Sequence, residues 1–417
     1  MKKCILFIIV MILVICSTFG NAFSQKKETI QFSYLPYNDF IKKSKETGKP
    51  IMIYFTGTGC SLCIKMEKLV FPQEEIYTFY NKSFINIELF DDYKKPDSAI
   101  KILQRKYGIV SQPTFIFIDS TGDVIHKSGY KEKNDFLLVG QQAAGSDNYR
   151  SWISLFEKGK VEINTLRKFL AVEQKPVLYA EMDYRCKAQE MLDKYFSSIS
   201  RSEYGNSENW EIIKKYVSNP YSDIFRFLLE NKSKFISTYG DKEVNEKVYS
   251  VYQDAWSGSM ESTSYIRAEK MISESNDPMA KLLLLFRKME DEFRNNKRIE
   301  NISWINFLNK YNSTILQYSY LVRPYLIYQI SEEITIKTPN DFKAIKIANS
   351  WLKSILEIPT NEDEDFFSEY AKTYFILGDK KSAITAQKRA IEIAEKRHLE
   401  KKYLDEYKAL LDIYMKR

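Results

Sequence analysis

The sequence has 417 residues, of which 44% are hydrophobic and 28% are charged. The formal net charge is +7, and acidic and basic residues are interspersed, so no basic stripe argues for a nucleic-acid partner. Five cysteines are too few for a fold of this size to depend on disulfides, and the length suggests about two or three domains.

Residues 1–24 have the three parts of a secretory signal peptide. Lys2 and Lys3 form a basic start, 5–15 is an apolar run, and Ala22-Phe23-Ser24 offers small residues at a cleavage site. The apolar run is too short to span a bilayer comfortably. We therefore expect export to an oxidising compartment, the periplasm, and no transmembrane segment in the mature chain.

Two other readings of the N-terminal segment stay open. Cys16 could be the lipid-bearing cysteine of a lipoprotein, although Ile15 stands before it where a small residue would be needed. The apolar run could also be retained as a membrane anchor. Both alternatives keep the rest of the chain outside the cytoplasm.

Between about residues 33 and 148 the pattern alternates between helices and strands, and we assign a first domain to residues 25–148. The predicted elements are a helix at 35–46, a strand at 51–55, a helix from residue 60 that Pro72 interrupts and 73–80 continues, a strand at 84–89, a helix at 97–107, a hairpin of strands at 114–118 and 124–127, and a helix at 133–143. The alternation predicts an α/β sheet with its functional site at the C-terminal end of a strand.

Two cysteines follow the apolar strand at 51–55. Cys60 lies where the loop after this strand meets the start of a helix, and the unpaired N–H groups and the helix dipole there favour a negatively charged sulfur. Such surroundings lower the pKa of a thiol. Cys63 lies one helical turn further on the same face, so it can attack a mixed disulfide formed at Cys60. This C-x-x-C predicts a dithiol–disulfide exchanger, with Cys60 as the nucleophile and Cys63 as the resolving thiol.

Taken together, the motifs of this segment resemble a thioredoxin-fold domain, specifically the exported subgroup that includes the C-terminal domain of the membrane-bound thiol:disulfide interchange proteins. They are Gly48-Lys49-Pro50, Cys60-x-x-Cys63 followed by Lys65-Met66, Phe71-Pro72, Phe84-Ile85-Asn86-Ile87, Tyr107-Gly108-Ile109 and Pro113-Thr114-Phe115. The resemblance covers under a third of the chain. It implies that Pro113 is a cis proline beside the cysteines and that Pro113 and Gln112 position the substrate.

The sequence departs from this pattern at two positions. Gly59 stands where the family usually has a tryptophan, and Tyr54 stands where thioredoxins proper keep a buried acid that assists proton transfer. These departures imply that substrate turnover is slower than in thioredoxin or tuned differently.

A zinc site is the main competing interpretation of the cysteine pair. Zinc takes four ligands, and the remaining candidates are Cys186, His126, His398 and scattered carboxylates, without a second C-x-x-C or an H-x-x-H. We therefore expect no metal and no cofactor. His126 is expected to be structural, and Cys186 to be a buried apolar filler or else a free thiol that pairs between chains.

Residues 149–417 have scarce glycine and a helical periodicity, which predicts an all-helical domain. Its clearest unit is a hairpin at 367–396. Small residues at Ala371, Ala383, Ala390 and Ala394 flank a Gly378-Asp379 turn and resemble one tetratricopeptide repeat, with Gln387 where an aromatic residue is common. No second clean copy follows. We interpret this helical domain as a platform that binds a protein partner or substrate. The alternative is a plain helical domain of unknown role.

The sequence therefore supports two functions of different classes. The first is an exported thiol–disulfide oxidoreductase that acts on protein thiols and disulfides. Because Ser61 and Leu62 carry no charge that would stabilise a thiolate, we expect a reductant or isomerase that an upstream electron donor keeps reduced. The second is a redox-inactive thioredoxin-fold scaffold whose helical domain binds a protein or envelope partner.

Overall fold

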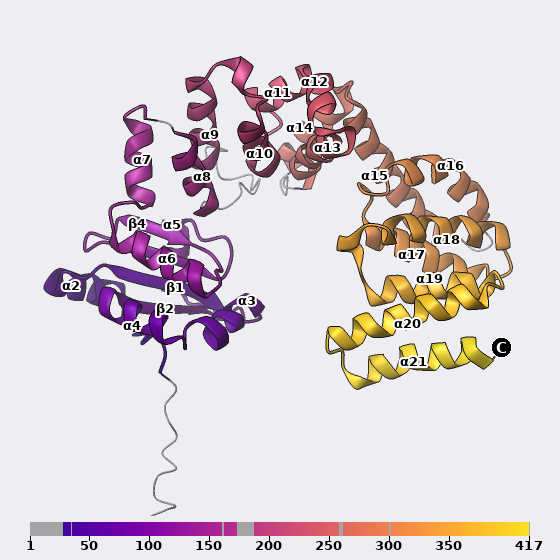
Figure 1. Ribbon diagram of the computed structural model, residues 1–417, viewed down its shortest axis with the longest axis horizontal. Coiled ribbons are helices and arrows are strands. Elements are labelled where there is room, and N and C mark those ends of the chain that lie inside the picture. Colours follow the sequence, from indigo (N-terminus) through magenta and orange to yellow (C-terminus); the bar gives the residue numbers. More distant parts are fainter. Residues whose placement is uncertain are drawn as a thin grey trace, which may run out of the picture. The chain divides into compact units, whose positions relative to one another are not determined.

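Figure 1 shows the computed structural model, which describes residues 28–34, 36–160, 162–172, 187–257, 262–299 and 302–416. The predicted signal peptide, Cys16 and Cys186 lie outside these residues. The described part divides into two compact units, one of residues 28–172 with 187–203 and one of residues 204–416.

The first unit is built on a four-stranded mixed sheet with the strand order β2-β1-β3-β4. The strands are β1 (Ile51–Gly57), β2 (Ile85–Asp91), β3 (Thr114–Ile118) and β4 (Val124–Ser128). β1 pairs with β2 in parallel and with β3 antiparallel, and β3 pairs with β4 antiparallel. The predicted strands and the α/β class are confirmed.

Helices cover both faces of this sheet. The face that carries the even-numbered β1 residues Met52 and Tyr54 packs against α3 (Ser61–Lys65), η1 (Met66–Val70), α4 (Glu74–Ser83) and α6 (Lys133–Ala144). The opposite face carries Ile51, Ile53 and Phe55 and packs against α2 (Tyr37–Thr47) and α5 (Ser98–Tyr107). Because successive side chains of a strand point to opposite faces, a strand covered on both sides is apolar throughout, as the sequence of β1 is.

Three further helices belong to the same compact unit as the sheet. They are α7 (Tyr149–Glu157), α8 (Ile163–Val172) and α9 (Lys187–Ser198), with a short 3-10 turn, η2, at Arg201–Glu203. Arg150 at the start of α7 donates to Asp119 Oδ2 at 2.6 Å and to the Val124 carbonyl at 3.1 Å. These bonds fasten α7 to the β3–β4 hairpin, so the compact unit continues beyond residue 148, where the sequence places the domain boundary.

The second unit is helical wherever it is described, and the predicted change of class is confirmed. Its elements are α10 (Ser207–Tyr216), α11 (Asp223–Glu230), α12 (Lys232–Tyr239), α13 (Asp241–Ser257), α14 (Ser262–Glu274), α15 (Pro278–Asn296), α16 (Trp304–Gln317), α17 (Pro324–Lys337), α18 (Phe342–Leu356), the 3-10 turn η3 (Pro359–Asn361), α19 (Glu364–Ile376), α20 (Lys380–Lys396) and α21 (Lys401–Lys416).

α19 and α20 form the predicted helical hairpin, which lies beside α21 in Figure 1. Ala371, Ala383 and Ala390 are fully buried, because small side chains allow the two helices to approach closely. Gln387 is also fully buried; its amide donates to the Tyr407 carbonyl at 3.0 Å and accepts from a neighbouring serine of α19. The polar residue at this position therefore connects three helices. The assignment to the tetratricopeptide class stays a prediction.

Candidate active site

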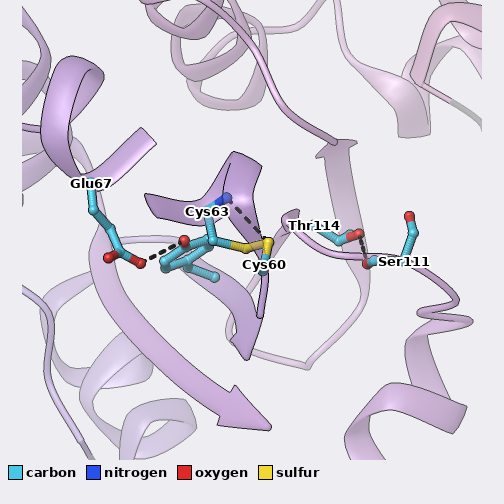
Figure 2. Close-up of a disulfide and its surroundings, with 6 residues drawn as sticks. Cys60, Cys63, Glu67, Ser111 and Thr114 are labelled. Carbon is cyan, nitrogen blue, oxygen red and sulfur yellow. Dashed lines mark hydrogen bonds between the residues drawn. A yellow bond between two sulfur atoms is a disulfide. The ribbon is translucent and has the colours of Figure 1, made fainter. Parts of the chain in front are cut away.

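The cysteine pair lies at the junction of β1 and α3, and Cys60 and Cys63 are joined by a disulfide. Cys60 is the N-cap residue of α3, and its sulfur accepts a hydrogen bond from the Cys63 N–H at 3.1 Å (Figure 2). Gly59 precedes it with φ +80°, a left-handed conformation that glycine adopts without strain. Cys60 is partly exposed, whereas Cys63 is only 1% exposed. The two sulfurs therefore meet different surroundings, as a nucleophile and a resolving thiol require.

The loop before β3 lies beside this junction. The peptide bond between Gln112 and Pro113 is cis, as the resemblance implies, and the Thr114 hydroxyl donates to the Ser111 carbonyl at 2.7 Å across it (Figure 2). Thr114 is the register partner of Phe55, which places the loop at the C-terminal end of β1.

An open pocket reaches the disulfide between the two loops. Its lining residues are Thr58, Gly59, Cys60, Ser61, Leu62 and Gln112. A Cβ on Gly57 would lie 2.6 Å from Gln112 Oε1, so glycine at 57 lets the Gln112 side chain rest on the strand end. Leu62 is 43% exposed and adds apolar surface to the mouth of the pocket. The structure thus brings Gln112 together with Cys60; the role of Gln112 and Pro113 in positioning substrate stays a prediction.

The Lys65 ammonium group contacts Glu132 and Tyr130. Its ammonium group lies 2.8 Å from Glu132 Oε1 and 5.1 Å from the centre of the Tyr130 ring. Its hydrogen bonds to Glu132 and Tyr130 raise the pKa of Lys65, so it stays charged but neutralised by its partner. Stabilisation of a thiolate at Cys60 therefore comes mainly from the start of α3.

Sequence reasoning missed a carboxylate next to the site. The Tyr54 hydroxyl, which belongs to the same core cluster as Cys63, donates to Glu67 Oε1 at 3.0 Å, and Figure 2 labels Glu67 near the cysteine pair. Burial is the main cause that raises the pKa of Tyr54, so its hydroxyl keeps its proton. One feature of the sequence could have indicated this carboxylate: Glu67 follows Cys63 by one helical turn.

His126 has a structural environment. It is fully buried on β4, where Nδ1 accepts the Tyr149 backbone N–H at 3.1 Å and the ring meets Trp152 edge-on at 5.4 Å. Nothing in the part of the chain that the structure describes gathers three histidine, cysteine or acidic side chains as a metal site would require. Likewise, none of the described helices is long and apolar enough to cross a membrane.

The chain thus has a mixed sheet with a Cys-x-x-Cys disulfide at the start of the helix that follows β1, and a cis-proline loop lies beside this disulfide. These features define a thioredoxin-like domain. In agreement with this, residues 37–144 match the family model described as "Thioredoxin-like domain". This match covers the sheet and its covering helices, from α2 to the end of α6.

Three curated relatives match this chain over 119, 101 and 95 residues. The chain is 23% identical over 119 residues to the thiol:disulfide interchange protein DsbD of Campylobacter jejuni, which covers 28% of this chain and 20% of that protein. It is 25% identical over 101 residues to the disulfide bond reductase DsbH of Chlamydia pneumoniae, covering 23% of this chain and 61% of the relative. It is 28% identical over 95 residues to thioredoxin H4 of Arabidopsis thaliana, covering 23% of this chain and 71% of the relative. The chain thus spans about a fifth of the DsbD proteins.

Solved structures match over the same share of the chain. A DsbH oxidoreductase aligns with 22% identity and a TM-score of 0.26, covering 29% of this chain and 90% of its own. A thioredoxin from Thermus thermophilus aligns with 20% identity and a TM-score of 0.25, covering 28% of this chain and 91% of its own.

Because Cys60 is more exposed than Cys63, we expect the two thiols to be alkylated at different rates. In reduced protein, Cys60 at the helix start should react with iodoacetamide at least about tenfold faster than buried Cys63, because the thiolate is the reactive form and must be reached by the reagent. Peptide mass spectrometry after timed quenching measures both rates in one sample. Equal rates at the two cysteines would contradict the assignment of Cys60 as the nucleophile.

Proposed function

We propose that the protein is an exported thiol–disulfide oxidoreductase of protein substrates, with Cys60 as the nucleophile and Cys63 as the resolving thiol. The observation that carries this proposal is the disulfide at the N-terminus of α3, which joins a partly exposed and a buried sulfur. The DsbD and DsbH relatives, whose names describe thiol:disulfide interchange and disulfide reduction, support the reaction class.

The reaction proceeds in two exchanges. The Cys60 thiolate attacks one sulfur of a substrate disulfide, the substrate S–S bond breaks, and one substrate thiolate leaves and is protonated. Cys63 then loses its proton and attacks Cys60 Sγ, which releases the second substrate thiol and forms the Cys60–Cys63 disulfide. The substrate gains two electrons, and an upstream dithiol donor restores the reduced pair.

The direct test is insulin reduction by the purified mature chain with dithiothreitol as the donor. Precipitation of the insulin B chain well ahead of a protein-free control supports the proposal. A rate equal to the dithiothreitol background, with the disulfide shown to open and close by mass spectrometry, would favour the scaffold alternative instead.

The reaction direction follows from the residues between the cysteines. Ser61 and Leu62 add no charge, and Lys65 is paired with Glu132, so the reduced thiolate is only modestly stabilised. A weakly stabilised thiolate means a low potential. We expect a value nearer about −270 mV than about −120 mV, which suits a reductant or isomerase. Equilibration with glutathione buffers measures it, and a value above about −150 mV would make the protein an oxidant instead.

The tripartite pattern of residues 1–24 supports export to the periplasm, and the intact mass of the exported protein tests it, because cleavage leaves a chain that begins at Gln25. A chain that kept Met1 or carried lipid on Cys16 would favour an anchored form. We propose residues 25–148 as the redox domain, with α7 to α9 packed in its compact unit, and residues 149–417 as the helical region that holds a protein partner or substrate.

A further inference from the structure

The second compact unit contains a small pocket between helices α13, α15 and α17. Its polar lining comes from all three: Tyr249 and Gln253 on α13, Arg287 and Glu290 on α15, and Arg323, the N-cap residue of α17. The rest of the wall is apolar. Because electrostatic interactions are strong in apolar surroundings, the charges of these groups decide what the pocket can hold.

The ion pairs at this pocket leave an excess of positive charge. The buried Glu290 carboxylate accepts a hydrogen bond from Arg294 at 2.6 Å and another from Arg323. Arg287 comes no closer to this carboxylate than 3.9 Å, and its guanidinium group lies 5.7 Å from the centre of the Trp256 ring. Three guanidinium groups therefore surround one carboxylate, and the donors of Arg287 are not used by it.

Three side chains that line the pocket have donors without an acceptor. Within the described ranges, the Arg287 guanidinium, the Tyr249 hydroxyl and the Gln253 amide make no hydrogen bond. Tyr249 is only 5% exposed, and burial raises the pKa of Tyr249 to about 12, so its hydroxyl keeps the proton that it can donate. The charges of Arg287 and Arg323 oppose this shift, which places both guanidinium groups near the hydroxyl. An anion in the pocket would supply the acceptor that these donors lack.

We propose that this pocket binds a carboxylate group of a protein partner, an inference that rests on the proposed role of the helical region as a partner platform. Arg287 pairs with the carboxylate, because a planar guanidinium group matches its two oxygens. The Tyr249 hydroxyl and the Gln253 amide donate to the same oxygens, and the apolar wall receives the carbon stem that carries them. The Glu290 carboxylate in the wall repels a doubly charged phosphate group more than a singly charged carboxylate, so the carboxylate is the better occupant.

Short peptides test the pocket and separate the two sources of a carboxylate. Acetyl-Gly-Gly-Leu carries the group at its C-terminus, and acetyl-Gly-Glu-Gly amide carries it on a side chain. Acetyl-Gly-Gly-Leu amide and acetyl-Gly-Gln-Gly amide are their uncharged counterparts. Saturation-transfer NMR with the purified mature chain measures the binding of each peptide up to about 10 mM.

Two variants and a control assign the binding to the pocket. Arg287→Gln removes the guanidinium group, and Tyr249→Phe removes only the hydroxyl. Lys288→Gln removes an exposed positive charge from the next position of α15, which does not face the same way on the helix, and serves as the control. Circular dichroism checks that each variant is folded.

We expect at least one charged peptide to bind with a Kd of about 1 mM, and its uncharged counterpart at least about tenfold more weakly. Arg287→Gln should weaken this binding about tenfold and Tyr249→Phe about threefold, with the control unchanged. An equal loss in Arg287→Gln and Lys288→Gln would overturn the pocket, because only the net charge of α15 would then matter.

Equal binding of the charged and uncharged peptides would also overturn the pocket, while leaving a platform for uncharged segments in place. Inorganic phosphate that displaces the peptide at about a tenth of its concentration would contradict the choice of a carboxylate. Insulin reduction is measured on the same preparation. A wild-type chain that reduces insulin but binds none of the peptides would overturn the pocket without affecting the proposed redox reaction.

Discussion

Replacing Cys60 by serine should abolish insulin reduction, whereas replacing Cys63 by serine should convert the protein into a trap. Without Cys60 no mixed disulfide forms, because Cys63 is 1% exposed and its sulfur is not within reach of a protein substrate. Without Cys63 the mixed disulfide at Cys60 forms but is not resolved internally, so turnover should fall by about a hundredfold or more.

Both variants should keep the fold. Cys60 caps α3 by accepting the N–H of residue 63 at 3.1 Å, and serine is among the best residues at an N-cap, so Cys60→Ser retains this bond. Circular dichroism checks the fold, and non-reducing electrophoresis with mass spectrometry identifies the adducts of Cys63→Ser on residue 60. Cys186→Ser is the matched control and should reduce insulin like the wild type. A Cys60→Ser protein that still turns over would refute the site.

The first compact unit should lose stability as the pH falls from about 6.5 to about 4, because of His126. Its ring is fully buried against Trp152, and burial lowers the pKa of His126 to about 4, with the neighbouring Lys127 contributing and Asp147 opposing. Below about pH 6.5 the unfolded chain binds a proton that the folded chain does not bind until about pH 4, so acid favours unfolding across this window. The loss amounts to about 3 kcal/mol at most.

Protonation would also remove the acceptor that holds α7 to the sheet, because Nδ1 of His126 receives the Tyr149 N–H. Hydrogen exchange of peptides from β4 and α7 in the full chain, corrected for intrinsic rates, should report the loss. His126→Gln keeps an acceptor without titrating, so the stability of this variant should fall less over this range than that of the wild type. His398→Asn is the control, because His398 is exposed and asparagine tolerates its φ of +55°. An equal pH dependence in wild type and His126→Gln would contradict the prediction.

The sequence alone was sufficient for the sheet and the redox pair, because both depend on local signals. The strand Ile51–Gly57 could be predicted from an uninterrupted apolar run, and this run is what a central strand needs when helices cover both of its faces. The position of Cys60 followed from its place between a strand and a helical pattern, and the helix cap confirmed it.

Side-chain partners across the fold could not be predicted in the same way. Tyr54 lies in β1 and Glu67 lies in η1, so their hydrogen bond depends on how α3 and η1 pack on the sheet. The pairing of Lys65 with Glu132 likewise depends on the approach of α6, a segment far away in the sequence. Periodicity reports which face of an element is buried but not which residue lies opposite.

The sequence by itself determined that a C-x-x-C stands at the end of a buried strand, that the chain changes from α/β to helical near residue 149, and that no charge lies between the cysteines. Only the tertiary structure decided that Cys63 is sealed in the core, that Gln112 rests on Gly57 beside the disulfide, and that α7 is bonded to His126 in the same compact unit as the sheet. The physical reason is the range of the forces involved: backbone propensity and apolar periodicity act between neighbours in the chain, whereas burial, pKa and hydrogen-bond partners arise when distant segments pack together.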